Sequence, residues 1–340
     1  MPGFPVRCMM KKILPLCFLL WSAVLAAQDP VYSQFYAAPL QLNPAFAGAA
    51  SAPRFGGIYR NQWPGLNAYQ TYGFFYEQDV TRLNSGFGLF LEGDNAGDGI
   101  LKSSRLAGTY AYNLRLSQKL RVRFGVEAAW RQTALDWDKL VFPDQLNPTA
   151  GPINTSLEQR PEQTTRSALD LSSGLLLTSD QFWLGFSLKH LNTPNQNFLI
   201  VNDNLSRGLP LLYALQGGME LNVKKSNKGT PGAFVSPNFL FISQGPYQQI
   251  NLGAYAGVGA VFGGAWFRHT FGNADAAILS LGFRQGIFKI GLSHDVTLSE
   301  LAGRSGGAYE LSIGFLLDQS ETIKNKKNRS QINNCLGMFQ

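Results

Sequence analysis

Apolar and polar residues alternate with a period of two along most of this chain. Between residues 120 and 130 every even-numbered residue is apolar, from Leu120 through Phe124 to Trp130, and the odd-numbered ones include Arg121 and Arg123. Side chains of a strand point alternately to its two faces, so such a segment has one apolar face along its full length. Alternating segments of about ten residues are typical of transmembrane β-strands, whereas strands of a soluble sandwich are nearer 5–6 residues. The pattern therefore favours an all-β outer-membrane barrel over a soluble β-sandwich.

The pattern predicts fourteen antiparallel strands, an even number, as closed single-chain outer-membrane barrels usually have. Pro237 weakens the ninth candidate, and the eleventh has no clean register around Trp266 and His269. The expected strands cover residues 54–60, 68–78, 85–92, 104–116, 119–131, 168–178, 181–189, 211–222, 233–243, 248–258, 260–269, 277–285, 287–296 and 308–317.

Connection lengths support this assignment. With both termini in the periplasm, every second connection should be a short turn. Residues 117–118, 179–180 and 286 are short connections and fall on that side. The long connections 132–167 and 190–210 fall on the other side, where extracellular loops belong, and the basic turn 224–232 is the one exception.

The N-terminal residues have the organisation of an export signal. Arg7, Lys11 and Lys12 precede a short apolar stretch, and Ala26 and Ala27 follow it, as in a secretory signal peptide. We therefore divide the chain into a signal peptide (1–27), an N-terminal plug or periplasmic segment (28–52), a transmembrane β-barrel (53–317) and a basic periplasmic tail (318–340). Removal of residues 1–27 takes away three of the 29 basic residues and none of the 22 acidic ones, so the net charge falls from +7 to 26 − 22 = +4.

Composition excludes several other classes. Only 15% of the residues are charged, and the 24 Phe, 12 Tyr and 6 Trp are far more aromatic residues than a disordered chain carries. Three cysteines are too few for a disulfide scaffold, and cleavage of the signal peptide would leave Cys335 alone. An exported chain with scattered charges does not favour a nucleic-acid partner.

The residues show no enzymatic constellation. The three histidines, His190, His269 and His294, lie on different strands or strand ends without the spacing of metal ligands. The loop 93–99 is rich in Gly and Asp but lacks the downstream Glu of an EF-hand loop, so we interpret it as a turn rather than a calcium site. We expect no catalytic residues, no metal and no cofactor. We expect the outer face of the barrel to contact outer-membrane lipid.

Several segments together resemble the PorP/SprF family of outer-membrane proteins of the type IX secretion system. They are QDPVYSQFY (28–36), LNPAFAG (42–48), YRNQWPG (59–65), KIGLSHDVTLSEL (289–301) and GGAYEL (306–311), and the ending from Cys335 to Phe339 is similar to that of many members. The resemblance implies a non-enzymatic component of type IX protein secretion in the cell outer membrane, reached by Sec-type export. It also implies binding, export or anchoring of a secreted surface protein with a C-terminal sorting domain, such as a gliding-motility adhesin, together with other secretion subunits. The alternative is a passive outer-membrane channel or porin.

The residues of these segments are our candidates for contacts with a partner or with a plug inside the barrel: Asp29, Pro30, Tyr32, Gln34, Phe35, Asn43, Pro44, Phe46, Trp63 and Asp295. The segment 28–52 is too apolar for a free tail, and we expect it to plug or brace the barrel. Inward positions supply a polar lumen with Arg115, Arg121, Arg123, Glu127, Arg131 and Lys189. The loop 132–167, with Asp136, Trp137, Asp138 and Asp144, and the loop 190–210 are expected to grip an extracellular client.

Overall fold

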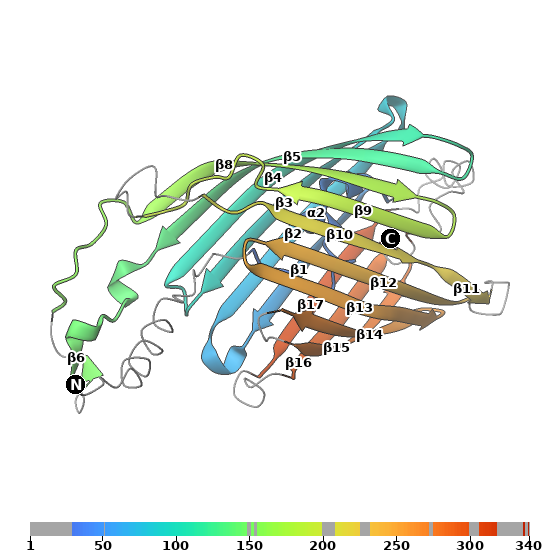
Figure 1. The fold of residues 1–340 in the computed structure, drawn as a ribbon. Helices are drawn as coiled ribbons and strands as arrows, with labels where there is room; N and C mark the ends of the chain where they lie inside the picture. The colour runs from blue at the N-terminus through green and yellow to red at the C-terminus, as the bar shows by residue number, and fades with distance from the viewer. Residues whose placement is uncertain are drawn as a thin grey trace, which may run out of the picture.

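The chain folds into a closed β-barrel with a short segment of chain inside it (Figure 1). The computed structural model describes residues 29–50, 52–147, 151–152, 155–198, 208–224, 232–271, 275–298, 306–317, Leu336 and Phe339. The expected signal peptide (1–27), most of the basic tail and Cys335 lie outside these residues. No helix among the described residues is long and apolar enough to cross a membrane.

Fourteen antiparallel strands form the wall, as the alternation predicts, with β10 and β11 as two parts of one interrupted strand. Each pairs with its neighbours along the chain, and β1 pairs with β17 to close the barrel, from Arg54 opposite Leu316 to Gln62 opposite Ala308. The strands are β1 (Arg54–Gln62), β2 (Tyr69–Val80), β3 (Ser85–Ala96), β4 (Leu101–Arg115), β5 (Arg121–Leu135), β8 (Thr165–Thr178), β9 (Phe182–Lys189), β10 (Leu212–Met219), β11 (Leu221–Lys224), β12 (Ala233–Gln244), β13 (Tyr247–Val258), β14 (Val261–Thr270), β15 (Ala276–Gln285), β16 (Phe288–Thr297) and β17 (Ala308–Leu316).

Pro237 lies where the wall is interrupted. The pairing of β10 with β12 ends at Gly218 and Asn238, and the pairing of β11 with β12 begins at Leu221 and Val235. Pro237 falls in the gap between these two ladders. Proline has no N–H to donate, so the sheet accommodates it where ladder bonds are already missing. Strand β14, whose register was unclear from the sequence, is regular, with Trp266 buried on the inside.

The two faces of the wall differ in the way that the alternation predicts. Outward residues such as Phe74, Leu106 and Leu281 are exposed and apolar. Inward residues are buried although many are polar or charged, among them Arg105 and Glu127. An apolar outer face with a polar interior is the arrangement of an outer-membrane barrel.

Most short turns lie at one end of the barrel and the longest connections at the other, with 245–246 and 225–232 as exceptions. The short turns at the first end follow β2, β4, β8, β13 and β15, and by the general rule for such barrels they are periplasmic. The extracellular end carries the connection from β5 to β8, which contains two 3₁₀ turns and the short strands β6 (Leu146–Asn147) and β7 (Gly151–Pro152). That short hairpin was not expected from the sequence.

Candidate functional site

Residues 29–50 lie inside the barrel and form what we call the inner segment. It contains the short helix α2 (Pro39–Leu42) and the 3₁₀ turn η2 (Pro44–Phe46), and most of its residues are buried. Asp29 contacts Arg131 near the extracellular end of β5, whereas the N–H of Gly48 donates to Glu77 near the periplasmic end of β2. The segment therefore runs from the extracellular half of the lumen to the periplasmic rim. Strand β1 then starts at that rim.

Glycines on the inner face of the wall make room for the inner segment. A Cβ atom on Gly125 would lie 2.2 Å from the backbone nitrogen of Ala45, and one on Gly86 would lie 2.1 Å from the carbonyl oxygen of Ala47. These separations are below contact distance, and the obstacles are backbone atoms that cannot rotate away. Strand glycines of this kind mark places where another stretch of backbone approaches closely.

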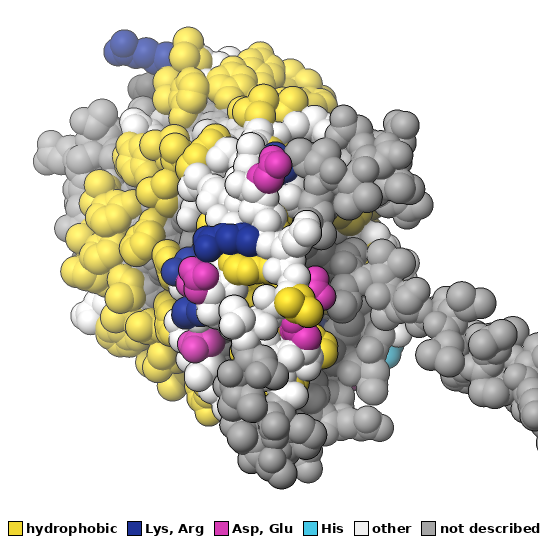
Figure 2. All heavy atoms as spheres, turned by 90° about the vertical axis from the view of Figure 1, so that its left-hand side faces the viewer, with side chains coloured by type: hydrophobic (Ala, Val, Ile, Leu, Met, Phe, Trp, Pro, Cys, Tyr) yellow, Lys and Arg dark blue, Asp and Glu magenta, His cyan; other side chains and the backbone are white. Residues whose placement is uncertain are grey.

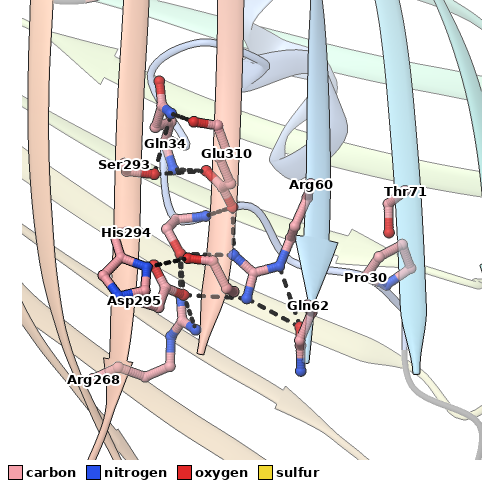
Figure 3. Close-up of polar contacts among 12 residues, drawn as sticks. Pro30, Gln34, Arg60, Gln62, Thr71, Arg268, Ser293, His294, Asp295 and Glu310 are labelled. Atoms are coloured by element: carbon pink, nitrogen blue, oxygen red, sulfur yellow. Dashed lines mark hydrogen bonds and ion pairs between the residues drawn. The ribbon is translucent and has the colours of Figure 1, made fainter. Parts of the chain in front are cut away.

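A network of buried side chains, which we call the Ser33 anchor, fixes the first turn of the inner segment (Figure 3). The carboxylate of Glu310 accepts from the backbone N–H groups of Ser33 (2.7 Å) and Gln34 (2.8 Å). The Ser33 hydroxyl donates to Asp295 at 2.7 Å. Arg60 pairs with both carboxylates, at 3.1 Å from Asp295. Strands β1, β16 and β17 thus hold the segment together, and Arg268 of β14 adds a second guanidinium, 2.9 Å from Asp295.

A second network, the Asp29 anchor, fixes the start of the inner segment. Arg131 donates to both carboxylate oxygens of Asp29 at 3.1 Å. His190 follows β9 directly, and its Nε2 lies 3.1 Å from Asp29 Oδ2 while its Nδ1 lies 2.9 Å from Asp170 Oδ2. Lys189 Nζ lies 3.8 Å from Asp29 and donates to the carbonyl oxygen of Gln41. All five charged or titratable side chains of this anchor are buried.

The anchor changes the acidity of its members. Burial alone would lower the pKa of the His190 imidazole, but Asp29 and Asp170 outweigh it and raise that pKa above its ordinary value. Burial would likewise raise the pKa of the Asp29 carboxyl, whereas Arg131, His190 and Lys189 hold it well below its usual range. Both shifts favour a charged Asp29 beside a protonated His190.

An aromatic cluster joins the inner segment to the far end of the chain. The Phe46 ring stacks on Phe339 at 5.0 Å between ring centroids, and Trp183 of β9 contacts both rings edge-on. Phe35 contacts Phe339 at 6.1 Å and Trp266 at 5.1 Å. The carbonyl oxygen of Phe339 accepts from Arg54 at the start of β1. The inner segment and Phe339 therefore share one apolar core within the lumen.

The remaining candidate residues of the inner segment also meet the wall. Asn43 donates to the carbonyl oxygens of Leu175 and Phe186, and its side-chain oxygen accepts from Ala45, so it caps η2 and binds two strands. Pro30 accepts from Gln41. Tyr32 is buried beside Gly73 of β2, and Pro44 starts η2 beside Gly125.

Trp63 does not join this set. It follows β1 at the extracellular end, where its N–H donates to the carbonyl oxygen of Gly307 and its ring lies 5.8 Å from that of Tyr69. Its position joins the loop after β1 to the start of β17. It contacts neither anchor among the interactions of the described residues.

Several residues of the site were not singled out from the sequence: Arg60, Glu310, Asp170, His190, Arg268, Trp183 and Phe339. Arg60 and Glu310 are direct partners in the register of β1 and β17, which a single sequence does not give. Two signals were available: Arg60, Glu310 and Phe339 lie in segments that resemble the family, and the inward parity of Arg131 and Lys189 places both where they contact Asp29.

The extracellular connection after β5 is held by its own contacts. Asp144 accepts from the backbone N–H of Leu157 at 2.6 Å and from the Ser156 hydroxyl at 3.0 Å, and the Leu157 N–H lowers the pKa of its carboxyl. The rings of Trp137 and Phe142 lie 4.9 Å apart. This arrangement leaves Leu157 90% exposed. Figure 2 looks onto this end of the molecule, where acidic and basic side chains gather beside one another.

Candidate metal ligands do not converge in the described part of the chain. No group of three or more His, Cys, Asp or Glu side chains there could hold a metal ion. Of the loop 93–99, Asp94 lies at the end of β3 and accepts from Thr71 at 2.6 Å. His190 and His269 are each within hydrogen-bonding distance of carboxylates rather than of further metal ligands.

Comparison with known proteins identifies the family. Residues 24–315 match the family described as "Type IX secretion system membrane protein PorP/SprF". This chain belongs to the PorP/SprF family. As a PorP/SprF barrel it is an outer-membrane component of type IX secretion, in agreement with the resemblance noted from the sequence. No curated protein matches the chain.

Solved barrels are similar to this PorP/SprF chain at low identity. The Acinetobacter baumannii outer membrane protein Omp33 is 9% identical, with a TM-score of 0.44 over 79% of this chain and 100% of that one. The KdgM porin is 8% identical, with a TM-score of 0.36 over 77% and 98%. A mutant of Rh. blastica porin is 9% identical, with a TM-score of 0.32 over 77% and 97%.

Proposed function

We propose that this protein binds a secreted surface protein with a C-terminal sorting domain at its extracellular end, and helps to export or anchor it. Secretion subunits would contact its periplasmic end. The protein would act by binding, with no enzymatic step and no passage of the client through its lumen. Membership of the PorP/SprF family supports the secretion context.

The observation that carries the proposal is the occupancy of the lumen. The inner segment crosses the interior from Asp29 to Gly48, and its side chains pack against β1, β5, β8, β9, β14, β16 and β17. Phe339 adds a further side chain to the same core. Even a single α-helix with its side chains is about 10–12 Å in diameter, so a client would need a wide free passage. A lumen filled in this way leaves the rims and the extracellular loops as the surfaces for a client.

The connection after β5 is the extracellular surface that we assign to the client. The Ser156 hydroxyl and the Leu157 N–H donate to Asp144, and these bonds hold the exposed Leu157 side chain in a defined place. Exposed apolar residues with a polar surround are common features of protein interfaces. Val141 and Leu146 of the same connection are also exposed.

Affinity purification from gently solubilised outer membranes, followed by mass spectrometry, tests this proposal. We expect a large secreted protein with a C-terminal sorting domain in stoichiometric yield. Leu157→Ser should reduce that yield at least tenfold, while the matched variant Val223→Ser, exposed at the periplasmic end, should not. Recovery of secretion subunits alone would assign this copy to the core machinery instead.

Conductance in planar bilayers separates binding from a passive channel. The intact barrel should pass little current, and deletion of residues 29–50 should raise it, because that segment occupies the lumen. Large, steady conductance of the intact protein together with purification of the barrel alone would contradict the proposal and favour the porin alternative.

A further inference from the structure

The Asp29 anchor has the composition of a binding site for a carboxylate. Arg131 presents two N–H groups to the two oxygens of Asp29, which is the bidentate geometry preferred between guanidinium and carboxylate. His190 supplies a third contact at 3.1 Å and Lys189 a positive charge at 3.8 Å. The three cationic side chains belong to the rigid wall or follow it directly, whereas Asp29 is the first described residue of the inner segment. The cations therefore belong to the wall, and the carboxylate that they bind belongs to the inner segment within the lumen.

His190 lies between two carboxyl groups, and when both are ionised each contact needs a proton on the ring. A neutral imidazole carries one N–H, so it could donate to Asp29 or to Asp170 but not to both. The other nitrogen would then turn its lone pair toward a carboxylate oxygen at about 3 Å, which is repulsive. Because both distances are those of hydrogen bonds, the geometry fits the imidazolium form. The left-handed backbone of His190, at φ 61°, fixes the ring at the end of β9.

The charges around His190 favour the same form. The acids that face this region are Asp29 of the inner segment, Asp170 of β8, Glu92 and Asp94 of β3, and Glu127 of β5. The cations are Arg105 of β4, Arg131 of β5 and Lys189 of β9. Of these groups, Asp29 and Asp170 act directly on His190, and both favour its protonated form.

We propose that Arg131, Lys189 and His190 form a carboxylate-binding site in the extracellular half of the lumen, that Asp29 is its resident ligand, and that loss of the His190 proton releases this ligand. Release of Asp29 would open the lumen only if the inner segment closes it, and this consequence rests on the proposed function. The carboxylate-binding site itself does not depend on the proposed function, because its contacts are the same whether or not the lumen conducts. Its ligand class is a carboxylate, and another small carboxylate should occupy it when the Asp29 side chain is absent.

The sign of the pH effect follows from the raised pKa of His190 in the folded protein. A group whose folded pKa lies above its unfolded value of about 6.5 contributes stability that is fully present below that value. This contribution is lost as the pH rises through the folded pKa. The start of the inner segment should therefore be held below about pH 6.5 and should be released in alkaline solution.

Thiol labelling measures that release directly. In a Cys335→Ser background, Val31→Cys reports on the inner segment and Gln159→Cys, in the exposed connection after β5, corrects for the pH dependence of thiol reactivity. The labelling ratio of position 31 to position 159 should rise at least tenfold from pH 6 to pH 9. His190→Gln should abolish this pH dependence, whereas His294→Gln, on the outward face of β16, should leave it unchanged.

Chemical rescue identifies the ligand class. Asp29→Ala should give a high labelling ratio at pH 6, and sodium acetate should lower it toward the value of the parent, while sodium chloride at equal ionic strength should not. The same acetate should have no effect in an Asp29→Ala, Arg131→Gln double variant. Heat-modifiable migration in gels verifies that each barrel is folded, and Asp29→Asn serves as a second variant should Asp29→Ala not fold.

Two outcomes would overturn the site: a parent labelling ratio that is equal at pH 6 and pH 9, or a folded Asp29 variant that does not respond to acetate. Failure of the proposed closing function gives a different result. In that case deletion of residues 29–50 would leave the conductance unchanged, whatever the labelling ratios are.

Discussion

Glu310 is the residue on which closure of the barrel and binding of the inner segment both depend. It lies directly opposite Arg60 in the register of β1 and β17, the pair that closes the barrel, and it accepts from the N–H groups of Ser33 and Gln34. Glu310→Gln would remove the negative charge. It would also place an amide N–H₂ group against the N–H groups of Ser33 and Gln34, which are themselves donors. Because one partner of a buried ion pair is lost, we expect a decrease of about 3–5 kcal/mol in the free energy of unfolding. Reversible urea unfolding in lipid vesicles measures this.

The matched control for that prediction is Glu158→Gln in the extracellular connection. Glu158 is exposed, and its backbone N–H donates to the Ser156 hydroxyl. Its substitution should leave the unfolding midpoint unchanged. An equal loss of stability in both variants would show that only the charge of Glu310 matters, and not its position between β1 and β17.

At the scale of the elements, η2 packs directly against the backbone of β5 because Gly125 has no side chain. Gly125→Ala would place a Cβ atom 2.2 Å from the nitrogen of Ala45, so η2 must leave its position or β5 must bend. Gly108→Ala on the outward face of neighbouring β4 meets nothing within 4 Å and is the matched control. Hydrogen exchange of residues 41–48, followed by mass spectrometry, should be at least tenfold faster in the Gly125 variant and unchanged in the Gly108 variant. Unchanged protection in both would contradict the docking of η2 against β5.

The elements also show how far the sequence alone leads. The period-two pattern predicts the strands because successive residues of a strand point alternately inward and outward. The fourteen observed strands follow that prediction closely. The interruption between β10 and β11 could not be predicted, since it depends on which residues face Pro237 across the sheet. The ion pairs of the anchors depend on register in the same way. Phe339 lies in a tail without periodicity, and nothing local indicates that its ring is buried.

At the scale of the whole molecule, Phe339, close to the C-terminal end of the sequence, packs against the inner segment in the lumen. Phe339 stacks on Phe46 and contacts Trp183, and Arg54 holds its carbonyl oxygen. Phe339→Ala would empty the centre of this cluster, and we expect a loss of about 3–5 kcal/mol in the free energy of unfolding. Phe271→Ala, at the exposed end of β14, is the control and should change little. A thermal melt followed by heat-modifiable gel migration measures both, and equal midpoints would exclude a structural role for the tail.

The path of the inner segment sets an order of events for assembly. The segment precedes β1 in the chain and lies along the lumen, while β1 finds its second partner only in β17, more than 240 residues later by the register of Arg54 and Leu316. The seam therefore stays open until the last strand has been delivered, and during that time the interior is reachable from the side. Arg60 and Glu310 pair across this closure, and the same Glu310 carboxylate accepts from backbone N–H groups of the inner segment. In this protein the side chain that pairs across the closing strands also binds the segment inside the barrel.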